Sequence, residues 1–389
     1  MKPKLLKKMR FAVPAIALIA VGTIPLLGLG PGTSSYIVVA YNDLGMHCMN
    51  EDFSEIAILP PYNNLRAQVI RRGSGPNVIS EDEITLDYSI ANNTRSADKT
   101  NFWKYAPALF GIAIPPNIGL GGKGLSGSMD RQSRFYEAIG IPVTPIDDSG
   151  RLNPYPLGII TAKLNGTEVA RTTTVIPVSQ ELSCNLCHND PGVSMETDIL
   201  RDHDRLHGTN LEASKPVLCA GCHADPALGT AGVPGVSMLS HAMHGAHASR
   251  VGVLSLANEC YACHPGVRTQ CHRDVHLANG VNCIDCHGDL AAVGSTARTP
   301  WVDEPRCSNC HTRAGFDFEE PGKLFKDSRG HGGVMCVTCH GSPHAIGPNV
   351  TAADNLQAER LQGHSGVLNT CTVCHTTMPD DPFPHRMDD

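Results

Sequence analysis

The chain has 389 residues, a formal net charge of −7 and an aromatic content of only 5%, with 38 glycines and 28 prolines. An acidic chain is a poor partner for nucleic acid, because phosphate binding needs a basic face. So few large side chains cannot fill a conventional core over the whole length, and another source of apolar bulk is expected in part of the chain.

The first 33 residues are typical of an export signal. Basic residues up to Arg10 are followed by an apolar stretch from Phe11 to about Leu29, and this order marks a secretory signal peptide. We predict cleavage after about Gly30 to Ser35. The stretch is also near the length that spans a bilayer, so an uncleaved anchor is the alternative. Removing the five basic residues changes the formal charge of the remainder to −12.

Residues 34–183 contain a single cysteine and are predicted to form a separate β-rich domain, best described as sandwich-like. Ile84–Ile90 alternates apolar and polar residues with period two, as a half-buried strand does, and Tyr36–Tyr41 is a second expected strand. Residues 158–178 are predicted to form a hairpin that turns on Asn165-Gly166. Helical periodicity in this region is confined to residues 131–139.

A glycine-rich segment in the same region matches the dinucleotide-binding pattern G-x-G-x-x-G, at Gly122, Gly124 and Gly127. It follows Pro115-Pro116 rather than a strand, and no helix is predicted to start there. The pattern indicates a dinucleotide-binding site only when it lies in a strand-to-helix turn, so we predict a flexible loop here.

The pattern Cys-x-x-Cys-His occurs seven times between residues 184 and 375. The cysteine pairs are Cys184 and Cys187, Cys219 and Cys222, Cys260 and Cys263, Cys283 and Cys286, Cys307 and Cys310, Cys336 and Cys339, and Cys371 and Cys374, followed by His188, His223, His264, His287, His311, His340 and His375. On a helical turn the positions i, i+3 and i+4 share one face, so each copy can present two thiols and an imidazole to one flat object. Haem c is such an object, bound by two thioethers and a proximal histidine.

Two other interpretations of the motif fit less well. Zinc would require the motifs to be paired into tetrahedral sets, and seven is an odd number. A redox-active dithiol does not need a histidine after the second cysteine. Seven c-type haems are therefore predicted, with about 29 of the residues 184–389 for each. We expect a domain of short helices and little regular structure, wrapped around packed haems that supply the missing apolar bulk.

Twelve histidines lie outside the motifs, which is more than seven haems need for a second axial ligand. Ligation by two histidines closes the iron to substrates, and such a haem transfers electrons. The first-choice distal ligands are His207, His241, His244, His276, His331, His344 and His364, with His203, His247, His272 and His385 as reserves. His47 is a further candidate that would reach across the domain boundary. No spare histidine lies between His287 and His311, so the chain must fold back on itself.

Two cysteines lie outside the motifs, namely Cys48 and Cys271. In an exported protein two such cysteines most simply form a disulfide, which here would clamp the β-rich domain onto the haem domain. The alternatives are a non-standard haem site built on Cys271-His272 and two unpaired thiols.

Several segments resemble multihaem c-type cytochromes of metal-reducing and related anaerobic bacteria. Residues 260–271, 336–344 and 361–375 carry the resemblance in the haem half, and residues 41–48 and 59–65 look like an N-terminal domain joined to such haem regions. The resemblance implies respiratory electron transfer in the periplasm, on the outer surface or beyond the cell. Catalytic relatives replace a proximal histidine with lysine, whereas all seven motifs here end in histidine.

Two functions stay open from the sequence. The first is an electron conduit, in which closely packed, mostly bis-histidine haems connect redox protein partners with a membrane or extracellular electron acceptor. In that role the β-rich domain would dock a partner or a second copy of the chain, as in a homo-oligomer. The second is an oxidoreductase in which one haem keeps an open position for a small nitrogen or sulfur species. The excess of histidines favours the conduit.

Overall fold

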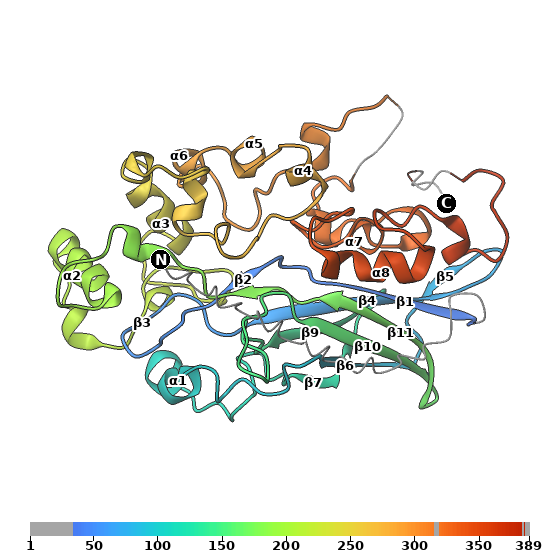
Figure 1. The fold of residues 1–389 in the computed structure, drawn as a ribbon, viewed down its shortest axis with the longest axis horizontal. Coiled ribbons are helices and arrows are strands. Elements are labelled where there is room, and N and C mark those ends of the chain that lie inside the picture. The colour runs from blue at the N-terminus through green and yellow to red at the C-terminus, as the bar shows by residue number, and fades with distance from the viewer. Residues whose placement is uncertain (1–33, 315–318, 383–384, 386–389) are drawn as a thin grey trace, which may run out of the picture.

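The fold is described by a computed structural model that covers residues 34–314, 319–382 and 385. The predicted export signal, residues 1–33, lies outside the described residues. None of the helices in the described ranges combines the length and apolar character that a membrane span requires. The molecule is elongated, with β-sheets along one side and short helices along the other (Figure 1).

One antiparallel sheet is built on the apolar strand β1 (Tyr36–Tyr41), which was expected from the sequence. The strand order is β1, β4 (Asn63–Arg71), β9 (Tyr136–Ile141) and β8 (Asp130–Arg131), and β5 (Asn77–Ile79) also pairs with β4. β1 is buried on both faces. Val38 packs in the main core of the β domain, whereas Ile37 and Val39 pack against Val373 from the last motif.

The second antiparallel sheet has the order β11 (Thr167–Val175), β10 (Leu157–Leu164), β6 (Ile84–Ile90) and β7 (Ser126–Ser128). It confirms the predicted strand and the predicted hairpin, because Asn165 and Gly166 turn with φ of 49° and 81°, as a two-residue hairpin loop requires. Leu86 and Ile160 of this sheet share one core with Val38 and Val69 of the other. The predicted sandwich-like, β-rich fold class is therefore confirmed.

The helical periodicity of residues 131–139 gave a wrong prediction, because most of this segment belongs to strands β8 and β9. Tyr136 and Ala138 are buried at alternate positions and pair with β4. A short apolar run fits both periods, and pairing with the neighbouring strand decides between them. The helix of this region is α1 (Phe102–Phe110), which contains Pro107.

Short parallel pairings join the β domain to the residues that follow it. β12 (Val178–Ser179) pairs with β2 (His47–Cys48), and β13 (Val217–Leu218) pairs with β3 (Ile56–Ala57). The glycine-rich segment around Gly122 runs directly into β7 as a loop, without a strand-to-helix turn. The segment after Ser183 is thus hydrogen-bonded to the β domain from its beginning.

The C-terminal region consists of short helices, as predicted. Its α-helices are α2 (Met195–His207), α3 (Leu239–His247), α4 (Val275–Ala278), α5 (Cys283–His287), α6 (Leu290–Val293), α7 (Cys336–His340) and α8 (Ala352–Gln362). The 3-10 helices are η1 (Cys184–Leu186), η2 (Glu212–Ser214), η3 (Cys219–Gly221), η4 (Val251–Val253), η5 (Glu259–Ala262), η6 (Cys307–Asn309), η7 (Phe325–Asp327), η8 (His331–Gly333) and η9 (Cys371–Val373). Apolar clusters among its described residues are small.

Polar side chains fix this region onto the first sheet. In β4, Gln68 accepts hydrogen bonds from the amide of Met335 at 2.8 Å and the hydroxyl of Thr338 at 2.6 Å. From α8, Gln357 pairs with both backbone groups of Ala40, at 2.9 Å each. These bonds satisfy strand and motif backbone groups that are buried at the junction. The sheet therefore acts as a base for the last two motifs.

Candidate haem-binding sites

Each of the seven motifs forms one helical turn. In five of them the histidine amide donates to the carbonyl oxygen of the first cysteine at 2.8 to 3.0 Å, and the other two are the helices α5 and α7. The turn places both sulfurs and the imidazole on the same side, as the i, i+3, i+4 spacing predicts. This is the arrangement that attachment of one planar group through three side chains requires.

A second histidine faces every motif histidine. The pairs define seven sites, numbered by motif: His188 with His247, His223 with His203, His264 with His244, His287 with His344, His311 with His276, His340 with His385, and His375 with His331. Their ring centroids lie 5.9 to 6.3 Å apart.

This distance between ring centroids can be compared with the distance expected for two imidazoles that bind one iron ion from opposite sides. An imidazole nitrogen binds a first-row metal at about 2 Å, so two rings on opposite sides of one metal have centroids about 6 Å apart. Rings in direct stacking contact lie closer, as His203 and His207 do at 4.8 Å. The seven pairs thus match the spacing of two axial ligands with a metal between them.

Hydrogen bonds set the tautomer of several paired rings. The Nδ1 atom of His223 lies 2.8 Å from the carbonyl oxygen of Ser237. The Nδ1 atom of His244 lies 2.8 Å from the carbonyl oxygen of Ser240, and that of His247 lies 2.6 Å from the carbonyl oxygen of Met243. A carbonyl oxygen accepts, so Nδ1 must carry the proton in each ring. The lone pair is then on Nε2, where a metal can bind.

Burial lowers the pKa of several of the paired imidazoles. Desolvation by the surrounding protein lowers the pKa of His287 to about 4, and it lowers the pKa of His244 and His344 in the same direction. Nearby histidines reinforce the shift at His287. Neutral rings at pH 7 retain the lone pair that iron ligation needs.

The structure brings four first-choice distal candidates into these pairs, namely His244, His276, His331 and His344. The other three have different neighbours: His207 stacks on His203, His241 Nε2 lies 2.8 Å from the Arg298 carbonyl oxygen, and His364 Nδ1 lies 2.9 Å from that of Ser365. The reserves His203, His247 and His385 stand in the remaining pairs. His203 and His207 are one turn apart on α2, so spacing alone could not choose between them.

His47 does not face a motif histidine among the described residues. Its Nε2 lies 2.7 Å from the Pro60 carbonyl oxygen, and its ring packs against Tyr62. Desolvation lowers the pKa of His47 to about 4. A neutral ring with its Nε2–H bonded to a carbonyl is a structural histidine that fixes the β2 segment.

The surface of the C-terminal region suits a large apolar group. Among the described residues, most of the large apolar side chains that are exposed lie after Ser183, and they include Leu186, Leu206, Val233, Val253 and Ile284. Leu186 and Ile284 lie inside motifs, between the two cysteines. Apolar side chains beside paired thiols and imidazoles are what a thioether-bound haem would cover.

The first three sites are linked through two helices. Helix α2 carries His203 of site 2, and its neighbouring Asp202 lies 3.7 Å from Nδ1 of His188 in site 1. Helix α3 carries His244 of site 3 and His247 of site 1, one turn apart. Site 1 therefore lies between sites 2 and 3.

Sites 3, 4 and 5 follow in the order of the chain. Asn258 and Asn282, which cap the motif turns of sites 3 and 4, are hydrogen-bonded to each other at 3.1 Å. The segments that carry the distal histidines of sites 4 and 5 are also joined, because the Arg273 amide donates to the His344 carbonyl oxygen at 3.0 Å. Site 4 is thus next to both site 3 and site 5.

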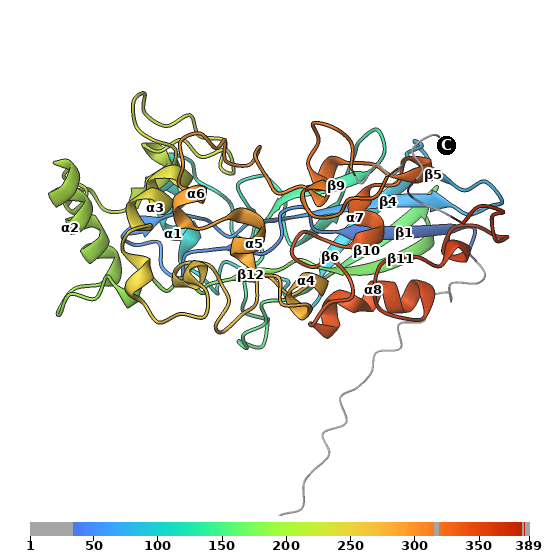
Figure 2. The same cartoon turned by 90° about the horizontal axis from the view of Figure 1, so that it is seen from above.

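The last three sites complete a single row. The neighbouring residues Glu319 and Glu320 join the motifs of sites 5 and 6, because Glu319 accepts from the hydroxyl of Ser308 in the site 5 motif at 2.8 Å and Glu320 accepts from the amide of Arg329, ahead of the site 6 motif, at 3.0 Å. The Leu368 amide, just before the last motif, donates to the Cys339 carbonyl oxygen at 2.9 Å. The order is therefore 2, 1, 3, 4, 5, 6, 7, and it agrees with the order of α2, α3, α5, α4 and α7 along the longest axis (Figures 1 and 2).

Residues 292–341 match the family model for cytochrome c554 and c-prime. This segment contains the complete motifs of sites 5 and 6. Within the matched residues the chain is similar to a multihaem c-type cytochrome domain. This domain implies c-type haem and electron transfer, and c-type cytochromes are typically exported. The comparisons with curated proteins and with solved structures found no match.

The two cysteines outside the motifs are Cys48 and Cys271, and the disulfide between them stays a prediction. Cys271 Sγ lies 3.9 Å from His344 Nδ1, and desolvation raises the pKa of both Cys48 and Cys271. His272 Nε2 lies 2.9 Å from Asp274 Oδ1. That contact occupies the nitrogen that a non-standard haem site on Cys271-His272 would need.

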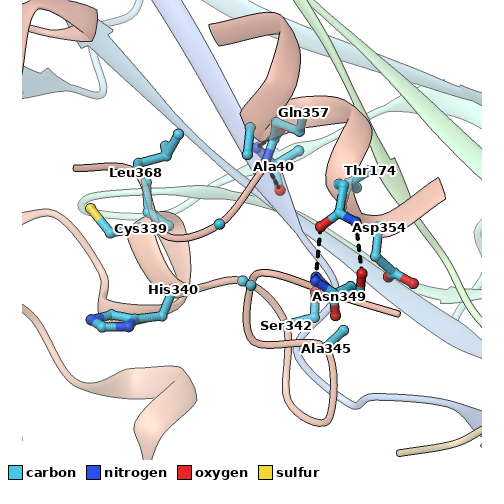
Figure 3. A pocket seen from close by; sticks show the side chains of 16 residues that line it. Ala40, Thr174, Cys339, His340, Ser342, Ala345, Asn349, Asp354, Gln357 and Leu368 are labelled. Carbon is cyan, nitrogen blue, oxygen red and sulfur yellow. Dashed lines mark hydrogen bonds between the residues drawn. The ribbon is translucent and has the colours of Figure 1, made fainter. Parts of the chain in front are cut away.

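A small cavity of about 40 Å³ lies where the cytochrome region meets the β domain, between β1, α7 and α8. Figure 3 shows its polar side, where the Asn349 amide donates to Asn355 Oδ1 and the Gln357 side chain donates to the Ala40 carbonyl oxygen, and it shows His340 and Cys339 pointing away from that side. This volume holds a water molecule rather than a porphyrin. Cys339 and His340 of site 6 are among the residues that line the cavity.

Proposed function

We propose that this protein is a heptahaem c-type cytochrome that conducts electrons along one row of bis-histidine sites. The observation that carries the proposal is the pairing of all seven motif histidines with a second imidazole at 5.9 to 6.3 Å. Bound haem iron supplies reversible one-electron exchange between its ferric and ferrous states. The two cysteines of each motif would anchor the group, and the paired rings would fill both axial positions.

The pairing favours a conduit over the alternative oxidoreductase. An enzyme that acts on a small nitrogen or sulfur species needs an iron with an open axial position. Here each motif histidine has its own partner ring, and the two terminal sites, 2 and 7, lie at opposite ends of the row. The fold thus supports entry of electrons at one end and exit at the other.

Partners and location follow from this arrangement as part of the proposal. The predicted export signal and c-type haem together favour the periplasm, the outer surface or the extracellular space, and a role in anaerobic respiration or extracellular electron transfer. A redox protein would dock at one terminal site, and a membrane or extracellular acceptor at the other. All fourteen paired histidines belong to one chain, so each copy in a homo-oligomer would hold its haems without ligands from another copy.

Carbon monoxide provides a test of closed coordination. In protein whose intact mass shows seven thioether-bound haems, carbon monoxide added to the reduced form should leave the absorption spectrum unchanged, because both axial positions are filled. Nitrite should likewise not be turned over. A complex of one carbon monoxide per chain, together with turnover of nitrite or hydroxylamine, would reject the conduit in favour of the oxidoreductase.

A further inference from the structure

Asp274 is a buried carboxylate at the back of one predicted axial ligand. Its side chain is 4% exposed, and it caps α4 by accepting the backbone amide of His276 at 2.8 Å through Oδ1. Its other oxygen, Oδ2, lies 3.4 Å from Nδ1 of His276, the distal ring of site 5. One residue therefore fixes both the helix start and the ring.

The charge of Asp274 is not neutralised by the neighbouring arginine. Arg273 is fully buried, but its guanidinium pairs with Asp354 at 2.7 Å. The imidazoles of His272 and His276 contact Asp274 directly, and its charge also acts on the more distant ring of His344. An imidazole that binds a metal through Nε2 is a neutral N–H donor at Nδ1, so the carboxylate would keep its negative charge next to a metal-bound His276 ring.

This arrangement differs from the other sites whose Nδ1 contacts are known. The Nδ1 atoms of His223, His244, His247 and His375 face backbone carbonyl oxygens, that of His203 faces the Thr209 hydroxyl, and that of His344 lies 3.9 Å from the Cys271 sulfur. Site 1 has a carboxylate nearby, but Asp202 is half-exposed and 3.7 Å from His188. Solvent weakens an exposed charge, so its effect on the ring is smaller.

We propose that Asp274 is a positioning residue that lowers the reduction potential of site 5. This proposal rests on the proposed haem function. A carboxylate that accepts from Nδ1–H gives the ring partial anionic character, which makes Nε2 a stronger donor and stabilises ferric over ferrous iron. Site 5 lies inside the row, so its reduction potential determines the free-energy change when an electron moves into or out of this site.

The substitution Asp274→Asn removes the charge and the acceptor that faces the His276 ring, whereas asparagine retains an oxygen that can cap α4. In a potentiometric titration of the haem-loaded protein, one of the seven components should move to higher potential. At a fixed potential its ratio of ferric to ferrous iron should fall about tenfold. The matched control Asp202→Asn should produce a smaller shift. If Asp274→Asn misfolds, Asp274→Ser keeps a capping oxygen without charge and carries the same expectation.

Two results would overturn the proposal. One is an unchanged titration in a variant that still carries seven low-spin haems. The other is an equal shift in the Asp202 and Asp274 variants, which would indicate a general effect of net charge. Neither result bears on the conduit itself, which the haem count and the carbon monoxide experiment test separately.

Discussion

Replacing His344 with alanine should convert one iron of the seven from low-spin to high-spin. The His344 ring lies 6.1 Å from that of His287, across the space an iron would occupy in site 4. A methyl group cannot reach the metal, and water or an empty position gives a weaker ligand field. Electron paramagnetic resonance of the oxidised variant should show one high-spin haem, and the reduced variant should bind one carbon monoxide per chain.

The matched control is His364→Ala, which removes another histidine of the same region. His364 does not face a motif histidine in the described part of the chain, and its Nδ1 bonds to the carbonyl oxygen of the next residue. All seven irons should stay low-spin in this variant. A high-spin signal of equal size in both variants would show that the pairing of His344 with His287 does not identify the ligand.

Replacing Arg273 with methionine should lower the free energy of unfolding by about 3–5 kcal/mol, because Asp354 would be left as a buried charge without its partner. The Arg273 side chain is 0% exposed and that of Asp354 is 5% exposed. Chemical denaturation of the haem-loaded variant would measure the loss. Sites 4 and 5 should lose their structure at the lowest denaturant concentration, because the Arg273 backbone joins the segments that carry His344 and His276. The Arg273 carbonyl oxygen also accepts a hydrogen bond from the Val350 amide at 2.9 Å.

Two controls separate this ion pair from a general loss of charge. Arg268→Met removes an exposed arginine five residues earlier and should leave stability nearly unchanged. The double variant Arg273→Met with Asp354→Leu should recover much of the loss, since an apolar pair needs no compensation. If the double variant is no more stable than Arg273→Met alone, the buried charge is not the cause.

The sequence allowed the cofactor class and the main strands to be predicted, because both depend on local patterns. The cysteine and histidine spacing of each motif is contained in five residues, and the hairpin at Asn165-Gly166 needs only its own turn chemistry. These features reappear in the structure with little change in their bounds.

The choice of facing histidines could not be made in the same way. His344 and His287 are far apart in the chain, and His203 was indistinguishable from His207 until the path of α2 was known. The contact of Asp274 with His276 depends on the local turn that starts α4. An Asp-x-His spacing is the signal that could have indicated it, but this spacing alone does not show which way the ring turns.

Electron paramagnetic resonance of the unmodified, fully oxidised protein tests the central claim most directly. Seven bis-histidine sites predict only low-spin signals. The ring planes are nearly parallel in sites 3 and 7, at 15° and 13°, and are inclined by 59° to 84° in the other five. Parallel rings split the iron orbitals that interact with them, whereas crossed rings leave those orbitals closer in energy and the signal more anisotropic. The account predicts two rhombic and five strongly anisotropic low-spin haems, and a high-spin signal that integrates to one iron per chain would contradict it.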